Sequence, residues 1–194
     1  MPPSADIYFS ADIEADGPIP GRFSMLSFAL TVAGTYDGRR FERIDPTLHT
    51  FYRELRPISD NVNEAALAVS GLDRDRLLTE GDDPHLAMTA ACDWVHEIAG
   101  DSQPVLAAMP VAFDWTWLYW YFTAFVVDGS PFGVSHCFDV KTAYVVKAHE
   151  PVARAHRGEM PPELQSKRPH THHALDDAIE QADIFANLFE WGGP

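Results

Sequence analysis

The stretch that decides the fold is residues 5–14, Ala-Asp-Ile-Tyr-Phe-Ser-Ala-Asp-Ile-Glu. Its compact apolar part, Ala5–Ile13, predicts a buried strand, and Glu14–Gly21, rich in Asp, Gly and Pro, predicts a loop. Residues i and i+2 of a strand point to the same face, so Asp12 and Glu14 project side by side. Two neighbouring carboxylates repel each other, and a divalent cation would relieve that cost. For this pattern alone, two solvated acids at a strand end are the simpler interpretation.

The rest of the chain continues the sheet and adds helices. Gly34–Gly38 carries a hairpin signal, so the strand that follows it should run antiparallel to the one before. Further strands are expected at Ser24–Ala33, Thr47–Leu55, Pro104–Met109 and Ser135–Val140, and helices at Val62–Val69, Pro84–Ile98, Asp114–Val127, Lys141–Ala148 and Ala174–Trp191. Three strands in a meander, followed by alternating helices and strands, predict an α/β fold with a mixed five-stranded sheet flanked by helices. We expect one domain over residues 1–194.

Composition narrows the class of protein. The chain has 194 residues, of which 46% are apolar and 22% charged, as is ordinary for a globular protein. Its two cysteines, Cys92 and Cys137, exclude a disulfide framework and a Cys-rich zinc site. Met1–Ser4 lacks the features of a signal peptide, and the longest apolar stretch, Val111–Val127, carries Asp114 and is short for a membrane span. A cytoplasmic protein without a membrane segment is expected.

The formal net charge of −15 argues against a protein that coats nucleic acid, because such proteins present a basic face. The charge is unevenly distributed, however. The segment from Lys141 to Arg168 holds six basic residues and three acids, so it is locally positive. Its two interpretations are a solvated loop and a surface that meets phosphates.

Two other places carry residues suited to chemistry. Asp114 follows an expected strand and opens an expected helix, where an N-cap role would explain it without any function. The second is His170-Thr171-His172-His173-Ala174-Leu175-Asp176-Asp177-Ala178, at the start of the last expected helix. A His and an Asp five residues apart on one helix point about 140° apart, so a cooperating His must lie in the turn before the helix. A histidine zinc site, or acids that merely favour the helix N-terminus, are the alternatives.

Taken in order, these pieces resemble the DEDDh family of 3′–5′ exonucleases, the ribonuclease T and proofreading-exonuclease group with a ribonuclease H-like fold. The matching motifs are Asp12-Ile13-Glu14, Phe113-Asp114 and His172-x4-Asp177, and Glu64–Leu72 looks like the segment after the third strand in these enzymes. The resemblance spans nearly the whole chain. One departure is Pro110, which stands where many relatives carry an Asn, and this puts any contact made by that Asn in doubt.

The resemblance implies a two-metal hydrolysis with Mg²⁺ or Mn²⁺, ions that suit hard oxygen ligands. Asp12 would bridge both ions, Glu14 and Asp177 would hold the ion that binds the attacking water, and Asp114 would act mostly through metal-bound water. His172 would take the proton from the attacking water. Spacing supports this choice, because His172 alone among the clustered histidines has an acid five residues later.

Substrate contacts are less well defined. Phe23 and Trp115 lie close in sequence to the expected ligands, where aromatic rings could stack on terminal bases, although core packing is an alternative. Lys167 and Arg168, together with Arg154 and Arg157, could meet phosphates. The expected partners are 3′ ends of single-stranded RNA or DNA, with RNA favoured because the chain carries no polymerase or helicase domain, and a homodimer is compatible with the family. A catalytically silent scaffold and a phosphodiesterase for very short oligonucleotides are the competing functions.

Overall fold

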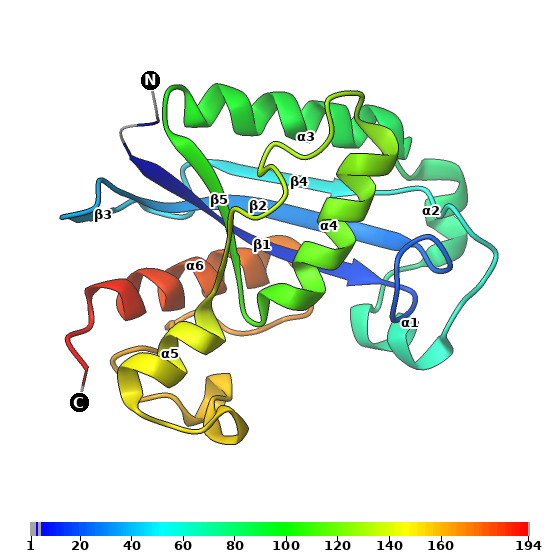
Figure 1. Ribbon diagram of the computed structural model, residues 1–194. Helices are drawn as coiled ribbons and strands as arrows, with labels where there is room; N and C mark the ends of the chain where they lie inside the picture. The colour runs from blue at the N-terminus through cyan, green and yellow to red at the C-terminus, as the bar shows by residue number, and fades with distance from the viewer. Residues whose placement is uncertain (1–2, 4, 194) are drawn as a thin grey trace.

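The computed structural model describes residue 3 and residues 5–193, and it has a mixed sheet between two groups of helices (Figure 1). The central strand, β1, pairs antiparallel with β2 and parallel with β5, and β5 pairs parallel with β6. β3 and β4 both pair antiparallel with β2, at different parts of that long strand. The strands are β1 (Asp6–Ala15), β2 (Met25–Tyr36), β3 (Phe41–Arg43), β4 (Thr50–Glu54), β5 (Gln103–Ala108) and β6 (Cys137–Asp139).

The helices cover the two faces of this sheet. α3 and α4 pack together on one face, and α6 lies across β1 and β2 on the other, next to α5 (Figure 1). The segment between α5 and α6 contains two short 3₁₀ turns, Val152–Arg154 and Arg157–Glu159. The helices are α1 (Glu64–Ser70), α2 (Arg74–Glu80), α3 (Pro84–Ala99), α4 (Val111–Phe125), α5 (Val140–Ala148) and α6 (Ala174–Glu190).

Alternation along β1 decides which side chains meet which helices. Phe9 and Ile13 point into the core formed with α3 and α4, whereas Tyr8 packs in the second core beside α6. Ser10, on the same face as Tyr8, donates a hydrogen bond to the carbonyl of Ala178 in α6. The strand period of two therefore sends Asp12 and Glu14 toward α6 as well.

The expected α/β class, a mixed sheet flanked by helices, is confirmed, but the sheet has six strands instead of five within the described residues. The strand that sequence analysis missed is β3, which has three residues, none of them fully buried, and so gives no apolar alternation. The helix that it missed is α2, where Leu77 is the one buried residue in a charged segment. Both elements lie at the periphery, where burial leaves a weak trace in the sequence.

Three expected boundaries were wrong for local reasons. The strand expected to end at Ala33 continues to Tyr36. The hairpin turn follows it, where the Asp37 carboxylate accepts hydrogen bonds from the backbone N–H groups of Arg39 and Arg40. The fourth strand begins at Thr50, since Asp45 caps a turn ahead of it. The helix expected from Asp114 begins at Val111, with Pro110 at the N-cap, so Asp114 is not an N-cap residue.

Cys92 and Cys137 are both free thiols. No helix in the described part of the chain is both long and apolar enough to cross a membrane. Met1, Pro2 and Ser4, on which the expectation of no signal peptide rested, lie outside the described residues.

Candidate active site

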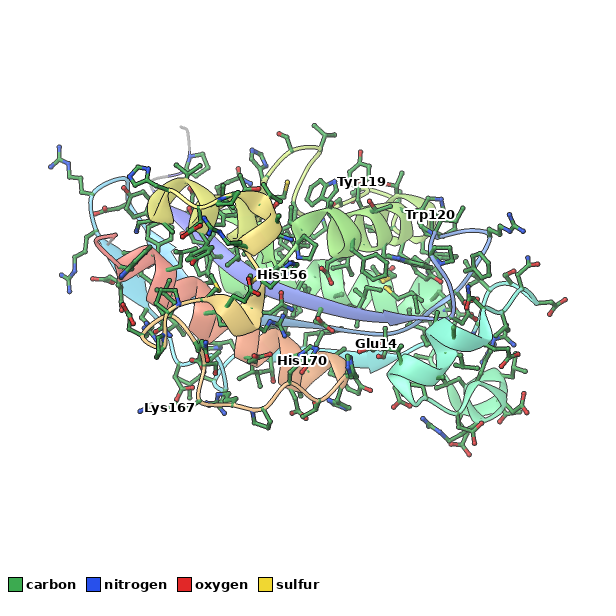
Figure 2. All side chains as sticks on the ribbon, turned by 90° about the horizontal axis from the view of Figure 1, so that it is seen from below. Glu14, Tyr119, Trp120, His156, Lys167 and His170 are labelled. Atoms are coloured by element: carbon green, nitrogen blue, oxygen red, sulfur yellow. The ribbon has the colours of Figure 1, made fainter. Side chains whose placement is uncertain are left out.

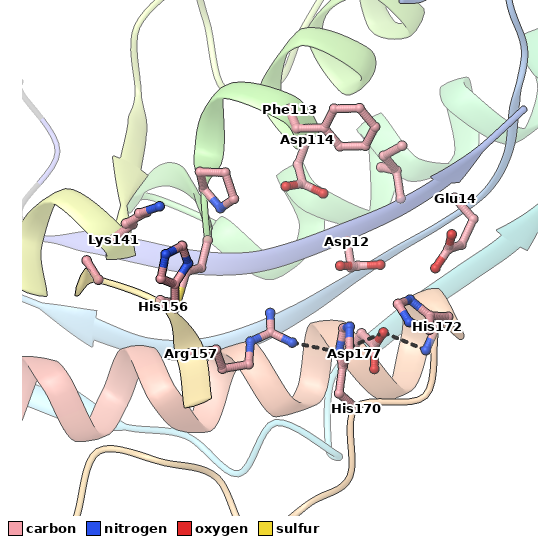
Figure 3. Close-up of a pocket in the computed structure, with 14 residues that line it drawn as sticks. Asp12, Glu14, Phe113, Asp114, Lys141, His156, Arg157, His170, His172 and Asp177 are labelled. Atoms are coloured by element: carbon pink, nitrogen blue, oxygen red, sulfur yellow. Dashed lines mark hydrogen bonds and ion pairs between the residues drawn. The ribbon is translucent and has the colours of Figure 1, made fainter. Parts of the chain in front are cut away.

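The carboxylates singled out in the sequence come together from three elements. Asp12 and Glu14 project from the C-terminal end of β1. Asp177 projects from the first turn of α6, and Asp114 from the first turn of α4 (Figure 3). Carboxylate oxygens of Asp12, Glu14 and Asp177 lie within 4.8 Å of one another. They meet here because β1 loses its partner β5 after Ser10, and this open edge leaves room beside the strand for side chains from two helices.

The cluster is electrostatically costly as it stands. Burial raises the pKa of Asp12 well above its usual range, and the neighbouring carboxylates of Asp114, Glu14 and Asp177 raise it further. Burial, followed by the carboxylates of Asp177 and Asp114, raises the pKa of Glu14 to about 7. Burial also raises the pKa of Asp114 to about 7, although backbone N–H groups of Asp114 and Ile13 and the charge of Arg157 oppose the shift.

This donor set fits a divalent metal ion. Closely spaced carboxylate oxygens are hard ligands of the kind that Mg²⁺, Mn²⁺ and Ca²⁺ prefer. A bound cation would remove the repulsion that raises these pKa values. The positive charge of Arg157 lowers the pKa values of both Asp12 and Asp114, and a single positive charge leaves most of the negative charge of the cluster uncompensated.

The turn before α6 folds back onto Asp177. The Asp177 carboxylate accepts hydrogen bonds from the backbone N–H groups of Thr171 (2.8 Å) and His172 (2.9 Å). His172 has a φ of 57°, which reverses the chain just before the helix. His172 thus lies off the helix, as the five-residue spacing requires, and its ring lines the same cleft as the carboxylates.

A second histidine, His170, also lies beside Asp177, and the five-residue spacing did not predict it. Nδ1 of His170 lies 3.0 Å from Asp177 Oδ2 and 3.2 Å from Glu180 Oε2. Arg157 donates to Glu180 Oε2 over 2.7 Å, so His170, Glu180 and Arg157 form one network beside Asp177. The rings of His170 and His172 are 4.6 Å apart. The left-handed turn at His172 produces this neighbourhood, and no spacing rule for a straight helix would find it.

A buried amide also holds the acidic cluster. The side chain of Gln181 donates to Asp12 Oδ1 and to the Ala11 carbonyl, and it accepts from the backbone N–H of Met109. It joins β1, the end of β5 and α6 at one point. Sequence analysis gave no sign of this residue, because a glutamine in a helix has no distinguishing pattern.

The site opens into a cleft of about 450 Å³. Besides the carboxylates and histidines, its wall includes the apolar side chains of Ile13, Met109, Pro110 and Phe113. Pro110, the position where many relatives carry Asn, therefore lies on the cleft itself. Phe113 is 43% exposed and offers an aromatic face next to Asp114.

The structure places the predicted substrate contacts elsewhere. The ring of Phe23 packs on Gly17, where an added Cβ would lie 2.1 Å from it. Trp115 stacks on Tyr119 at a ring distance of 5.3 Å and packs against the core. Neither residue lines the cleft, whereas Phe113 does.

Lys167 and Arg168 lie along a separate hollow, where Arg168 pairs with Asp183 over 3.1 Å. Figure 2 shows Lys167 apart from Glu14 and from His156. The basic residues on the cleft are instead Lys141, His156 and Arg157. All three belong to the locally positive segment, but its charge pattern does not reveal which members turn inward.

Comparisons with known proteins show which proteins this chain resembles. The chain is 31% identical over 181 residues to the 3′-5′ DNA exonuclease Cap18 of Escherichia coli, covering 93% of this chain and 90% of that protein. It superposes on the nuclease domain of 3′hExo, a DEDDh family member bound to rAMP, with a TM-score of 0.68 at 13% identity over 97% of this chain and 92% of that one. No protein-family model matches the chain.

A second solved structure, Escherichia coli exonuclease I in complex with a dT13 oligonucleotide, gives a TM-score of 0.63 at 14% identity. The match covers 96% of this chain but 41% of exonuclease I, so it shows a shared fold. A ribonuclease H-like sheet with an acidic cluster at the open edge of its central strand is an arrangement suited to nucleases that work through carboxylates. With the 31% identical relative, the chain belongs to the DEDDh family of 3′–5′ exonucleases.

Proposed function

We propose that this protein removes nucleotides from the 3′ end of single-stranded nucleic acid in a reaction that depends on two divalent cations, Mg²⁺ or Mn²⁺. The observation that supports this most directly is the cluster of Asp12, Glu14 and Asp177, whose oxygens lie within 4.8 Å of one another at the edge of an open cleft. Family membership supports the direction of attack, and the geometry of the cluster supports the choice of these residues.

The four carboxylates of Asp12, Glu14, Asp114 and Asp177 would hold the cations. Bound divalent ions supply Lewis acidity and neutralise the charge that develops on the phosphate. Asp177 has a second task, because it fixes the turn that carries His172. His172 would accept the proton of the attacking water, a role suited to an imidazole at neutral pH.

We propose DNA as the substrate class. The RNA preference expected from the sequence came from domain organisation, and the relative with 31% identity is named a DNA exonuclease. Structures bound to RNA and to DNA both resemble this fold at below 15% identity, so they do not favour either nucleic acid.

A ladder assay tests the proposal. 5′-labelled DNA and RNA 20-mers of one sequence are incubated with the protein in Mg²⁺, Mn²⁺ or EDTA, with Asp12→Asn as the control. Progressive shortening from the 3′ end that requires metal, faster on DNA, supports the proposal. Cleavage of dimers and trimers alone would favour the short-oligonucleotide phosphodiesterase, and metal-independent binding without cleavage would favour a silent scaffold.

A further inference from the structure

The cleft has two chemically different halves. Asp12, Glu14 and Asp177 lie toward one end, Lys141 and His156 lie toward the other, and the guanidinium of Arg157 lies between them beside His170 (Figure 3). On a chain with a net charge of −15, three basic side chains on one wall of the catalytic cleft are a local exception. Their chemistry suits a second anionic group, separate from the one that the carboxylates and their cations would take.

The basic wall is anchored in the fold. Ala155 and Met160, on either side of His156 and Arg157, are both buried in the core beside α6. Arg157 itself is held by Glu180, whose side chain is 7% exposed. The segment therefore presents these side chains from a fixed position, which is what a binding subsite requires.

Lys141 has no structural explanation of its own. It lies in the first turn of α5, the end of a helix where a positive charge is disfavoured by the dipole. None of the ion pairs among the described residues involves it. In Figure 3 its amino group projects over the cleft near His156. A phosphate group is a partner that suits a lysine in this position.

We propose that Lys141, His156 and Arg157 form a subsite for the phosphate immediately 5′ of the bond that is cut. This inference rests on the proposed function. In a strand with a free 3′-hydroxyl, the terminal nucleotide carries one phosphate, and that is the scissile one. Any second phosphate reaching the cleft belongs to the next linkage toward the 5′ end. The basic wall then makes the enzyme prefer substrates with at least two phosphates.

Matched short substrates isolate this phosphate. Thymidine dinucleotide, its 5′-phosphorylated form and the trinucleotide share the same first bond to be cut, but the last two carry the additional phosphate. The ratio of kcat/KM for phosphorylated over unphosphorylated dimer is measured in Mn²⁺. We expect a ratio of about tenfold or more for the wild type, the size of one charge-assisted contact, and a ratio near one for Lys141→Met.

Arg39→Met is the control, since Arg39 lies in the β2–β3 turn away from the cleft and carries the same charge. It should leave the ratio unchanged. A wild-type ratio of one, or a Lys141→Met variant that loses both activities in proportion, would overturn the subsite and show that the basic wall merely balances the carboxylates. In that case cleavage of a 20-mer would still support the proposed function.

Binding provides a readout that does not depend on turnover. Fluorescence anisotropy with 5′-labelled dT10 in Ca²⁺ gives the slope of log K against log salt. Lys141→Met should reduce that slope by about 0.7, the contribution of one phosphate contact on a single strand, whereas Arg39→Met should not change it. An equal slope in wild type and Lys141→Met contradicts the subsite even if the protein hydrolyses none of the substrates.

Discussion

The side-chain amide of Gln181 donates a hydrogen bond to Oδ1 of Asp12 over 2.9 Å. Its other contacts, to the Ala11 carbonyl and from the Met109 N–H, leave the amide no freedom to rotate, because its oxygen and nitrogen are each committed. Asp12 is the carboxylate that all its acidic neighbours repel. One oxygen of this carboxylate is thereby oriented, and the other is left for a cation.

Gln181→Glu should therefore weaken metal binding and hydrolysis while changing the side-chain shape little. The substitution replaces the donating NH₂ by an acceptor and adds a further negative charge beside Asp12. We expect roughly a 10–100-fold loss in activity or in Mn²⁺ affinity, as is usual for groups that orient metal ligands. Mn²⁺ titration by calorimetry and kcat/KM on a DNA 20-mer measure the two losses.

Gln103→Glu, the same chemical change on β5 outside the cleft, is the control for Gln181→Glu. Unchanged Mn²⁺ affinity in Gln181→Glu, with a normal circular dichroism spectrum, would show that Asp12 needs no such orientation. A loss of fold would be visible in that spectrum, and Gln181→Met, which adds no charge, would then replace the Glu variant.

Substitutions of the two histidines beside Asp177, His170 and His172, should differ in their effects on turnover and on metal binding. His172→Ala should lower kcat by at least about 10²-fold, the usual contribution of a general base, and should leave Mn²⁺ affinity within a few-fold. His170→Ala removes the contacts to Asp177 and Glu180, so its loss should include weaker metal binding. The reverse pattern, in which His170→Ala abolishes turnover at normal Mn²⁺ affinity, would assign the base to His170.

The sequence predicted the strands and helices that bury a regular pattern of apolar side chains. β1 was predictable since its apolar run ends in Asp12 and Glu14 at strand spacing, and α6 since its helical pattern continues for 17 residues. β3 and α2 were missed because they pack little apolar surface. An N-cap role was one interpretation of Asp114 because Asp favours that position. In the structure Pro110 is the N-cap and the helix begins at Val111, so Asp114 lies in the first turn.

Within the site, the residues of the sequence motifs were predictable, whereas the residues that hold them in place through hydrogen bonds and ion pairs were not. Spacing selected His172 and Asp177, and the structure brings both to the cleft. His170, Gln181 and Arg157 act through contacts between residues as far as 170 positions apart, which leave no local pattern. Lys167 and Arg168 were chosen for charge alone, and charge does not tell which side of a loop faces the cleft.

Without metal, the protein should be less stable at pH 8 than at pH 5.5. The pKa values of Glu14 and Asp114 are raised to about 7 in the folded state, from about 4 in the unfolded chain. Between these values the folded state retains protons that the unfolded chain has released, so stability falls as pH rises through about 4–7 and then levels off. In EDTA we expect a loss on the order of 2 kcal/mol, or about 4–8 °C in Tm.

Scanning calorimetry in EDTA and in millimolar Mn²⁺ measures this. Mn²⁺ should restore Tm at pH 8, because the cation binds the ionised carboxylates of the folded state. Glu14→Gln is the control, since it removes one of the carboxylates with a raised pKa and should reduce the pH dependence in EDTA. A metal-free Tm that rises from pH 5.5 to pH 8 would be inconsistent with these pKa shifts.

The end of β1 is held by a buried ion pair between Arg74 of α2 and Asp16, which lies two residues beyond Glu14. This pair makes Arg74 a determinant of stability. The Asp16 side chain is completely buried, and it accepts hydrogen bonds from Ser24 N–H (2.6 Å) and Arg74 Nε (2.9 Å). Arg74→Ala would leave that carboxylate charged and unpaired, at a cost of about 3–5 kcal/mol and on the order of 10 °C in Tm.

Arg76 lies on the same helix and pairs with Glu54, but this pair is partly exposed, so Arg76→Ala should cost no more than about 1 kcal/mol. The double variant Asp16→Asn/Arg74→Ala should recover part of the loss from Arg74→Ala, because the buried charge is then gone. Equal Tm losses for Arg74→Ala and Arg76→Ala would show that Asp16 is hydrated or neutral in the folded protein. The expected inequality would instead establish that a desolvated ion pair fixes the loop into which Glu14 leads.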